Sequence, residues 1–594
     1  MTANKKLGLT VLLVCIMPLT LLSQPENKDN IGYEYIFDQK ISMRDGIQLS
    51  AVMWKPKGAQ GSFPAVFVFT PYMAEAGQRD GKFFARNGYV CVYVDVRGRN
   101  NSEGEFFPFE NHSPDCHDVV EWIASQPWCN GQVAMMGGSY AGLVQWQTIK
   151  ELPPHLVTII PNAASFLGFD VPQPNNIYNI NYTMWLAVVA GRGPNFSLFG
   201  DSEFWHSHYY KLYAEGLPFE KFAEITGINK KFYERWMAHP AYDDFWKSMN
   251  AAPEDYQRLN IPVLSTTGYF DGSKAGTLHH YHQHMKYGNE EAKRKHYLIV
   301  GPWDHAGTKY PKKKVRGFEF GDNYAIYPDM RQMYLEWFDW IVKGKAKPEF
   351  LKKNVSCFMM NGNEWHQVDN IEDLSNAVDR WYLSSEDGMA HDVFNSGFLT
   401  TKPADNDQKP DIFAYDPLNI INREDFMKEA KDPAPYVSQR LAFGEEKLIY
   451  HSPPLREELQ IAGYVKVKLH VELNVPDTDL QVVLYEIRPD GTSLYLAQGW
   501  IRARYRNSLS KPELVKPGEI NVYEFKILDF FARKLKKGSR LRLLVSSVNT
   551  PMAQKNYNSG GDVSKESAKD ARTAIIKVYH DKSHPSVLEL PVKK

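Results

Sequence analysis

The chain has 594 residues, of which 43% are hydrophobic and 23% are charged, a composition typical of a globular protein. This length exceeds what one hydrophobic core usually supports, so it excludes a single small domain and predicts two to four domains. The 69 basic and 70 acidic residues nearly cancel. This balance argues against attraction to nucleic acid or to an anionic membrane, and it favours a ligand of neutral or mixed polarity.

The N-terminus has the pattern of an export signal. Lys5 and Lys6 precede the apolar run "LGLTVLLVCIMPLTLL", and the polar stretch "SQPENKDN" follows. We predict that residues 1–23 are a signal peptide and that the protein is secreted or periplasmic. An uncleaved anchor is the alternative, although the run is short for a full membrane span. A lipoprotein modified at Cys15 has less support, because Val14 is larger than the small residue expected there.

Strand and helix patterns alternate in two stretches of the chain. Residues 33–55 predict two strands around the turn "MRDG", and the apolar runs "FPAVFVFTPY", "YVCVYVDVRG" and "GQVAMMGGSY" follow with helix-like stretches between them. The later runs "IPVLSTTGYFDG" and "KRKHYLIVGPWDH" have the same form. This alternation predicts a parallel sheet with right-handed crossovers. We therefore assign residues 30–165 and 257–370 to the two parts of one α/β core.

The two remaining stretches have a different character. Residues 166–256 lack strand patterns and are rich in helical and aromatic segments such as "KKFYERWMAH", which predicts a helical insertion over the sheet. Residues 375–594 contain regularly spaced strands, among them "GYVKVKLHVEL" and "SRLRLLVSSV", without long helices between them. This pattern predicts a C-terminal all-β sandwich.

Ser139 lies where an apolar strand runs directly into a helix. Gly137 stands two residues before it, and Ala141 and Gly142 stand two and three residues after it. A nucleophile elbow needs small residues at these places, and it exposes the serine hydroxyl at a helix N-terminus. Alanine at 141 departs from the strict G-x-S-x-G spelling but is small enough to fit. A turn serine or a helix N-cap serine is the alternative interpretation.

Two further residues fit a catalytic triad with Ser139. Asp271 and His305 each follow a later predicted strand, at the edge of the sheet where ligands bind in open α/β proteins. In that arrangement Ser139 attacks a carbonyl, His305 accepts the serine proton, and Asp271 fixes the tautomer of the imidazole. Asp304 is an alternative acid, but neighbouring side chains in an extended segment point in opposite directions. We expect Asp304 to be a loop-capping or surface carboxylate instead.

A tetrahedral intermediate also needs hydrogen-bond donors aimed at its oxyanion. The backbone N–H of Tyr140 is one expected donor, because the elbow itself positions it. The phenol of Tyr72, at the end of the strand "FVFTPY", is the expected second donor. The alternative for Tyr72 is an aromatic ring that only packs on the wall of the pocket.

Two other patterns are weaker. His280 and His284 stand four residues apart on a predicted helix, a spacing that can hold zinc, but no general-base Glu lies between them and no third ligand is evident nearby. We expect them to be surface histidines and predict no metal site. Cys116 and Cys129 flank a predicted helix and could form a disulfide only if the chain doubles back.

The motifs "TPY", "DVRGRNNSEGEF", "HPAYDDFW", "GYFDG" and "GPWDH" resemble those of the cocaine esterase and X-Pro dipeptidyl-peptidase group of serine hydrolases. The segments "FAYDP", "YHSPPL" and "RLRLLVSS" resemble the C-terminal half of the same group, so the resemblance runs from about residue 33 to the end. It implies an α/β-hydrolase core, a helical cap and a C-terminal jelly roll. It also implies that Ser139, Asp271 and His305 form the triad, that Tyr72 and the Tyr140 amide are the oxyanion donors, and that no cofactor is needed.

The resemblance is less informative about the substrate. In the α-amino-acid ester hydrolases of this group, carboxylates hold the substrate ammonium, among them a pair two and three residues after the triad aspartate. The chain has Ser273 and Lys274 there. Lys274 is instead a candidate to bind a substrate carboxylate, as in the glutaryl-type cephalosporin acylases of the group.

We therefore predict a secreted serine hydrolase that cleaves an ester or amide bond through an acyl-enzyme intermediate. Its expected partner is a small-molecule ester, amide or short peptide, and its oligomeric state is left open. An X-Pro dipeptidyl-peptidase is the alternative enzyme. A carbohydrate-binding or surface-binding protein with an inactive hydrolase core is the alternative from another class.

Overall fold

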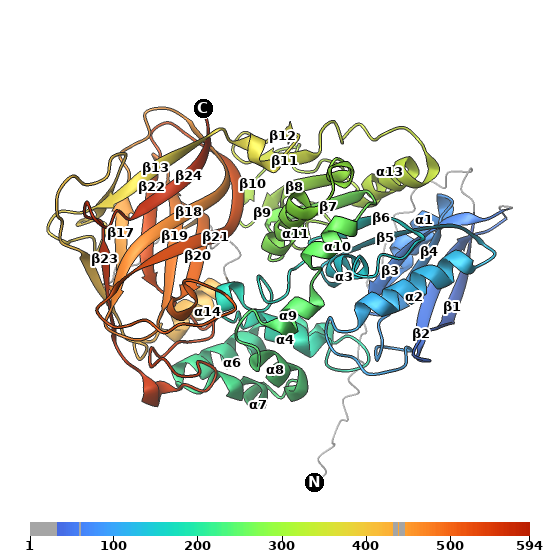
Figure 1. Ribbon diagram of the computed structural model, residues 1–594, viewed down its shortest axis with the longest axis horizontal. Helices are drawn as coiled ribbons and strands as arrows, with labels where there is room; N and C mark the ends of the chain where they lie inside the picture. Colours follow the sequence, from blue (N-terminus) through green and yellow to red (C-terminus); the bar gives the residue numbers. More distant parts are fainter. Residues whose placement is uncertain (1–31, 59–60, 432–436, 439–445) are drawn as a thin grey trace, which may run out of the picture.

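The computed structural model describes residues 32–594 apart from 59–60, 432–436 and 439–445. The predicted signal peptide (residues 1–23) and Cys15 lie outside the described residues. Figure 1 shows an α/β region on the right, a β-rich region on the left and a group of helices below both. None of the helices in the described part of the chain is long and apolar enough to span a bilayer.

The α/β region is built on a ten-stranded sheet. Its strand order is β1-β2-β4-β3-β5-β6-β7-β8-β11-β12, and the run from β4 to β11 is parallel, while β1, β2 and β12 are antiparallel to their neighbours. The strands are β1 (Tyr33–Ser42), β2 (Gln48–Pro56), β3 (Phe63–Thr70), β4 (Val90–Asp95), β5 (Cys129–Gly138), β6 (Leu156–Asn162), β7 (Val263–Phe270), β8 (His296–Asp304), β11 (Val355–Met359) and β12 (Glu364–Val368).

Helices cover both faces of this sheet because its parallel strands are apolar on both sides. On β3, Phe67 packs into one core cluster with α2 and α3, while Val66 and Val68 pack into another with α1 and α13. Alternate residues of a strand point to opposite faces, which explains this division. The covering helices are α1 (Gln78–Arg86), α2 (His112–Ser125), α3 (Tyr140–Thr148), α11 (Lys274–Tyr287) and α13 (Met330–Lys343). Three smaller elements complete the region: α12 (Glu290–Lys293), β9 (Lys314–Val315) and β10 (Phe318–Glu319).

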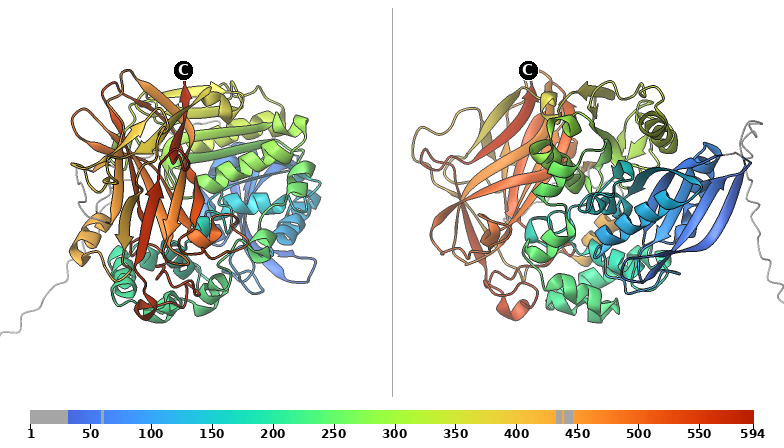
Figure 2. Two further views of the ribbon diagram at one scale, coloured as in Figure 1. Left: turned by 60° about the vertical axis from the view of Figure 1, so that its left-hand side comes forward. Right: turned by 45° about the vertical axis from the view of Figure 1, so that its right-hand side comes forward.

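Seven α-helices lie between β6 and β7, and all but the last two residues of α10 fall in the segment 166–256 for which helices are predicted. They are α4 (Asn181–Val188), α5 (Phe196–Phe199), α6 (Ser202–Ala214), α7 (Phe222–Thr226), α8 (Lys230–Met237), α9 (Asp244–Met249) and α10 (Pro253–Arg258). Their aromatic residues, such as Trp205, Tyr233 and Trp246, are buried in the same core cluster as α2 and α3. Both views in Figure 2 show α6, α7 and α8 below the sheet and the β-rich region. The aromatic composition of this insertion therefore serves its packing.

The C-terminal region consists mainly of strands. Twelve strands among the described residues of this region are joined in one hydrogen-bonded assembly, in the order β15-β23-β18-β24-β13-β14-β17-β22-β19-β20-β16 with β21 paired to β18. They are β13 (Ala377–Ser384), β14 (Gly397–Thr400), β15 (Asp411–Tyr415), β16 (Val437–Ser438), β17 (Lys447–His451), β18 (Leu459–Leu473), β19 (Asp479–Ile487), β20 (Ser493–Arg502), β21 (Ile520–Leu535), β22 (Arg540–Ser547), β23 (Ala574–Tyr579) and β24 (Val587–Lys593). One α-helix, α14 (Arg423–Lys431), interrupts the strands.

The C-terminal strands share a hydrophobic core with the edge of the α/β sheet. Leu298 of β8 and Val355 of β11 belong to the same buried cluster as Phe531 of β21 and Leu588 of β24. The two regions are therefore joined through apolar packing.

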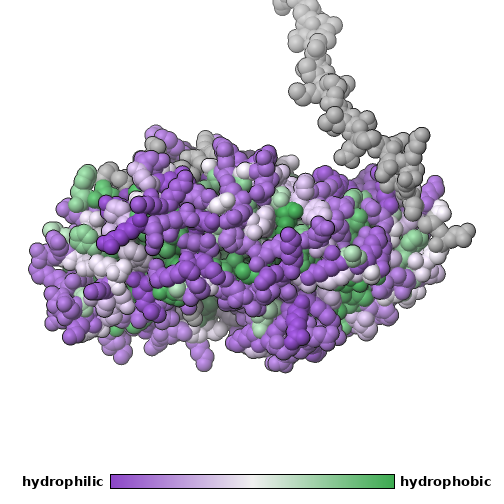
Figure 3. Space-filling view, turned by 90° about the horizontal axis from the view of Figure 1, so that it is seen from above, coloured by the Kyte–Doolittle hydropathy of each residue, from purple (hydrophilic) through white to green (hydrophobic). Residues whose placement is uncertain are grey.

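The surface seen from above in Figure 3 is mainly hydrophilic, with apolar side chains in separate patches.

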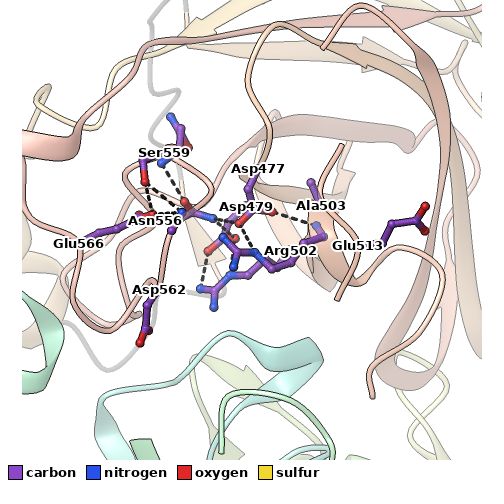
Figure 4. A network of polar contacts seen from close by, with 12 residues as sticks. Asp477, Asp479, Arg502, Ala503, Glu513, Asn556, Ser559, Asp562 and Glu566 are labelled. Carbon is purple, nitrogen blue, oxygen red and sulfur yellow. Dashed lines mark hydrogen bonds and ion pairs between the residues drawn. The ribbon is translucent and has the colours of Figure 1, made fainter. Parts of the chain in front are cut away.

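A buried network of charged residues organises one end of the C-terminal strands (Figure 4). The Arg502 guanidinium donates to both carboxylate oxygens of Asp479 at 2.8 and 2.9 Å, and Arg504 Nε donates to Asp477 at 2.8 Å. The Asn556 amide bridges the two carboxylates at 2.8 and 3.0 Å. Because the side chains of Arg502 and Asp479 are only 2% and 1% exposed, each charge depends on its partner.

The cysteines do not form the disulfide that the sequence left open. Cys91, Cys116, Cys129 and Cys357 are all buried, free thiols.

Replacing Arg502 with methionine should destabilise the protein by about 3–5 kcal/mol, because it leaves the buried Asp479 carboxylate without its counter-charge. The free energy of unfolding, from urea titrations followed by circular dichroism, measures this effect. The double variant with Asp479→Leu should regain part of the loss. Lys516→Met, which removes one partner of an exposed ion pair with Glu519, is the control and should have little effect. A double variant less stable than Arg502→Met would contradict the interpretation.

Candidate active site

Ser139 stands at a strained bend between β5 and α3. Its backbone φ and ψ are 60° and −119°, values that non-glycine residues rarely adopt. A Cβ added at Gly137 would lie 2.5 Å from Ala141 Cβ, and one added at Gly142 would lie 2.4 Å from the Asn162 carbonyl oxygen. The small residues are therefore required by close approach of the chain. Ser139 occupies the N-cap position, but its side chain makes no capping hydrogen bond and is partly exposed.

Asp271 and His305 form a direct pair on the loops after β7 and β8. His305 Nδ1 lies 2.6 Å from Asp271 Oδ1, so the other ring nitrogen, Nε2, is left to face a reacting group. The Asp271 side chain is fully buried and also accepts hydrogen bonds from the Thr267 hydroxyl at 2.8 Å and the Ser273 amide at 2.9 Å. These bonds hold the carboxylate in one orientation. The pair has the geometry that fixes the tautomer of a catalytic histidine.

The charges of this pair perturb both pKa values. Burial opposes the charged form of His305, but the charge of Asp271 and its hydrogen bond outweigh burial, and the pKa of His305 is raised. Burial likewise opposes ionisation of Asp271, but the His305 charge and the three hydrogen bonds lower the pKa of the carboxyl. The carboxylate is therefore ionised at neutral pH and stabilises a positive charge on the ring.

Asn162, the last residue of β6, connects the serine loop to the histidine loop. Its carbonyl oxygen accepts the Ser139 amide at 3.0 Å, and its side-chain amide donates to the Thr308 hydroxyl at 3.2 Å. That hydroxyl donates to the His305 carbonyl at 2.8 Å. Ser139, Asp271 and His305 thus follow β5, β7 and β8 at one edge of the sheet. Among the described residues no hydrogen bond joins Ser139 to His305. In catalytic sites of this kind, such hydrogen bonds can be long or poorly aligned before substrate binds and then tighten in the complex.

Tyr72 lies on the loop after β3, the neighbour of β5 in the sheet. Its hydroxyl oxygen accepts the indole N–H of Trp185 on α4 at 2.7 Å, so its own O–H remains able to donate. Burial raises the pKa of Tyr72 to about 12, against the smaller opposing effects of that bond and of the Arg99 charge. The phenol is therefore protonated at neutral pH, as an oxyanion donor must be.

The Tyr140 amide is at the first position of α3, where an N–H has no intrahelical partner. The Tyr140 side chain is anchored behind it. Its hydroxyl accepts the Phe109 amide at 3.0 Å and lies 2.5 Å from His112 Nε2, and its ring stacks on Phe109 with centroids 4.3 Å apart. A rigid side chain fixes the direction of the backbone N–H.

Arg99 ties the loop of Tyr72 to the inserted helices. It is fully buried, and its Nε and Nη1 donate to the carbonyls of Pro71 and Val189, each at 3.0 Å. Pro71 precedes Tyr72, and Val189 is the C-cap residue directly after α4, the helix that carries Trp185. Burial lowers the pKa of Arg99 to about 10, so the side chain stays charged at neutral pH.

Asp304 and Lys274, which lie close in sequence to His305 and Asp271, each contact other groups of the protein. Asp304 Oδ1 accepts the Gly307 amide at 2.7 Å, which is the expected loop cap. The Lys274 side chain is only 7% exposed, and its ammonium contacts Asp529 at 3.0 Å and the Tyr269 carbonyl at 2.9 Å. This buried ion pair argues against the predicted contact between Lys274 and a substrate carboxylate.

The expectation that His280 and His284 are surface residues is wrong, since both are fully buried. His280 lies 2.7 Å from the Tyr256 hydroxyl and 3.0 Å from the Ser165 carbonyl, and His284 Nδ1 lies 2.9 Å from His296 Nδ1. Burial lowers the pKa of His280 to about 3 and that of His284 to about 4. No group of three or more His, Cys, Asp or Glu side chains in the described part of the chain is arranged to hold a metal ion.

Three residues of the site were missed by sequence reasoning. Asn162 is a polar residue at the end of an apolar strand, a signal that could have been used. Arg99 stands in the segment "DVRGRNN", but nothing in its spacing indicates a buried clamp. Trp185 is one of many aromatic residues in the inserted helices, so its bond to Tyr72 has no sequence signature.

Comparisons with known proteins cover nearly the whole chain. A family model described as X-Pro dipeptidyl-peptidase (S15 family) matches residues 45–307, and one described as X-Pro dipeptidyl-peptidase C-terminal non-catalytic domain matches residues 350–589. Cocaine esterase from a Rhodococcus species is 27% identical over 584 residues, which cover 95% of this chain and 99% of the esterase.

Two solved structures resemble the fold over its full length. An α-amino acid ester hydrolase matches with a TM-score of 0.78 and 22% identity, covering 97% of this chain and 100% of that one. An aminopeptidase from the marine sediment archaeon Thaumarchaeota archaeon matches with a TM-score of 0.78 and 20% identity, covering 97% and 99%. With catalytic and C-terminal domains both matched, the chain belongs to the X-Pro dipeptidyl-peptidase (S15) family and is a serine hydrolase, related to esterases and peptidases.

Proposed function

We propose that this protein is a secreted esterase or acylase that cleaves an ester or amide bond through an acyl-enzyme intermediate. The single observation that carries the proposal is the His305–Asp271 pair, on the same sheet edge as the strained and partly exposed Ser139. Secretion rests on the signal-peptide pattern of residues 1–23. In this proposal the ten-stranded sheet is an α/β-hydrolase core, the helices between β6 and β7 are its cap, and the C-terminal strands form a jelly roll.

The chemical steps follow from the geometry of the side chains. Ser139 Oγ attacks the carbonyl carbon while His305 Nε2 takes its proton, and the Asp271 carboxylate stabilises the imidazolium that forms. The Tyr140 amide and the Tyr72 hydroxyl donate to the oxyanion. His305 then gives the proton to the leaving alcohol or amine. Water repeats the sequence and releases the acid, which restores Ser139.

The surroundings of Tyr72 favour a substrate with an uncharged, apolar acyl group. Rings of Tyr140 and Phe196 lie 6.2 and 6.1 Å from the Tyr72 ring, and Phe196 is 56% exposed. Asp170, a carboxylate near the triad, is buried and already accepts the amides of Phe166 and Gly276. Neither feature supplies a free charge for a charged substrate group.

An X-Pro dipeptidyl-peptidase is the second candidate, supported by the description of the matching family models. This activity requires recognition of a free amino terminus by carboxylates. Ser273 and Lys274 occupy the positions after the triad aspartate where an acidic pair would serve, so we rank this candidate second.

A substrate panel tests both candidates. Short-chain esters, aryl esters, acyl amides and Ala-Pro-anilide should be compared on the wild type and on Ser139→Ala. We expect ester hydrolysis with irreversible loss on treatment with an organophosphate, whose label maps to Ser139. Release of dipeptide from Ala-Pro-anilide without an ester preference would favour the peptidase instead. Undiminished turnover by Ser139→Ala would exclude both.

Asp271→Asn should change both the rate and its pH dependence. His305 must be uncharged to accept the serine proton, so activity is lost as the pH falls through its raised pKa. The variant removes the charge that raises this pKa, and the acidic limb of kcat/KM should move to lower pH. The rate should also fall by about 10⁴-fold through loss of the correct tautomer. An acidic limb that stays in place would contradict the assignment of His305 as the base.

Trp185→Phe tests whether Trp185 acts through Tyr72. Removing the indole N–H leaves the phenol less well oriented, so we expect kcat to fall by about tenfold with a small change in KM. Tyr72→Phe should cost about 10²–10³ in kcat, as expected for loss of one oxyanion donor. In the Tyr72→Phe background, Trp185→Phe should have no further effect on kcat. Additive losses would show that the two residues act independently.

A further inference from the structure

A cavity lies in the C-terminal region, where its described lining residues fall between Trp381 and Arg542. It has a volume of about 1040 Å³ and is lined by β14, β17, β22 and the loop after β17. Figure 1 shows β17 and β22 on the side of the β-rich region that is turned away from the α/β sheet. The strand β21, by contrast, contacts α11 and β11 of the core. The cavity is therefore separate from the proposed active site.

Strand register brings a row of side chains to one face of this cavity. Phe398 of β14 is opposite His451 of β17, and His451 is opposite Arg542 of β22. Arg540 stands two residues before Arg542 and so points to the same side. Leu541, between them, is fully buried in the core, which places both arginines on the outer face. Together with Arg456 of the adjoining loop, these residues are called the arginine face.

Within the described part of the chain, the hydrogen-bond partners of Arg540 and Arg542 on the arginine face are neutral groups. Arg542 Nε contacts His451 Nε2 at 2.7 Å and Nη1 contacts the Ser493 hydroxyl at 3.2 Å, while Arg540 Nη1 contacts the Ser452 carbonyl at 3.2 Å. All of these acceptors are neutral.

No Asp or Glu is among the described residues that line the cavity. This contrasts with Arg502 and Arg504, each of which has an aspartate partner. Burial and then the charges of Arg542 and Arg540 lower the pKa of His451 to about 4, so its ring is neutral at pH 7.

We propose that the arginine face binds an acidic polysaccharide, a chain of sugars that bear carboxylate or sulfate groups. Guanidinium groups bind such anions through paired hydrogen bonds. The ring of Phe398 is 46% exposed beside them and offers an apolar surface to a sugar ring. The cavity has room for several sugar units, more than a single small anion would fill. This binding does not depend on the proposed hydrolysis.

Binding of defined polysaccharides to the full-length protein tests the proposal. The probes are polygalacturonate for carboxylates, dextran sulfate for sulfates, neutral dextran and double-stranded DNA, measured by isothermal titration calorimetry at low salt. We expect at least one acidic polysaccharide to bind, and neutral dextran not to bind. Added salt should weaken the binding, because the charges of the arginine face are partly exposed.

Variants locate the site on the arginine face. The pair Arg540→Gln and Arg542→Gln should weaken binding by about tenfold or more, since hydrogen bonds to charged groups are lost. Arg456→Gln, on an exposed side chain, should weaken it too and keeps the test valid if the double variant fails to fold. Arg380→Gln is the matched control, because Arg380 is exposed on β13 and already paired with Glu589. Turnover of a small soluble ester should be unchanged in all of them.

Three outcomes would overturn the proposal. The first is that neither acidic polysaccharide binds more tightly than dextran. The second is that folded arginine-face variants bind as the wild type does. The third is that DNA binds equally well and is lost in the same variants, because the face would then recognise charge alone.

Discussion

The tight turn at Ser139 is the constraint on which the site depends. Its backbone is held in an unfavourable conformation by close approach of the chain at Gly137 and Gly142, and the Asn162 carbonyl fixes the Ser139 amide. Asn162 also bonds to the histidine loop through Thr308. The strain is thus balanced by hydrogen bonds that join the ends of β5, β6 and β8, so the position of the hydroxyl is a property of the sheet edge itself.

Electrostatics in the two halves of the molecule follow different rules. Around Asp271 and His305, burial and charge oppose each other, and pairing outweighs burial, so the pKa of Asp271 is lowered and that of His305 is raised. The buried Arg99 donates hydrogen bonds to carbonyls and lies over the Phe106 ring, and its charge acts on the neighbouring phenols of Tyr72 and Tyr140. The C-terminal region compensates Arg502 fully but leaves Arg542 with neutral partners. A cation without a charged partner within the protein can interact with another group, such as a phenol nearby or an anion from solution.

Sequence patterns predicted the structural features that depend on residues close together in the chain. Strand periodicity indicated the sheet, and small residues around Ser139 indicated the bend, because each needs only near neighbours in the chain. Contacts between distant segments were not predictable in this way. The bond from Trp185 to Tyr72 joins residues 113 positions apart, and the Lys274–Asp529 pair spans 255 positions. The buried state of His280 likewise depends on Tyr256 and Ser165, which no local pattern connects to it.

The shared core between the C-terminal strands and the edge of the α/β sheet has a consequence for how the chain can be divided. Leu298 and Val355 lie in one buried cluster with side chains from β21 and β24, so cutting the chain near residue 372 would expose apolar surface on both fragments. Neither half can therefore bury all of its apolar surface by itself. Joining the C-terminal half to another enzyme would require a complementary hydrophobic surface on that enzyme.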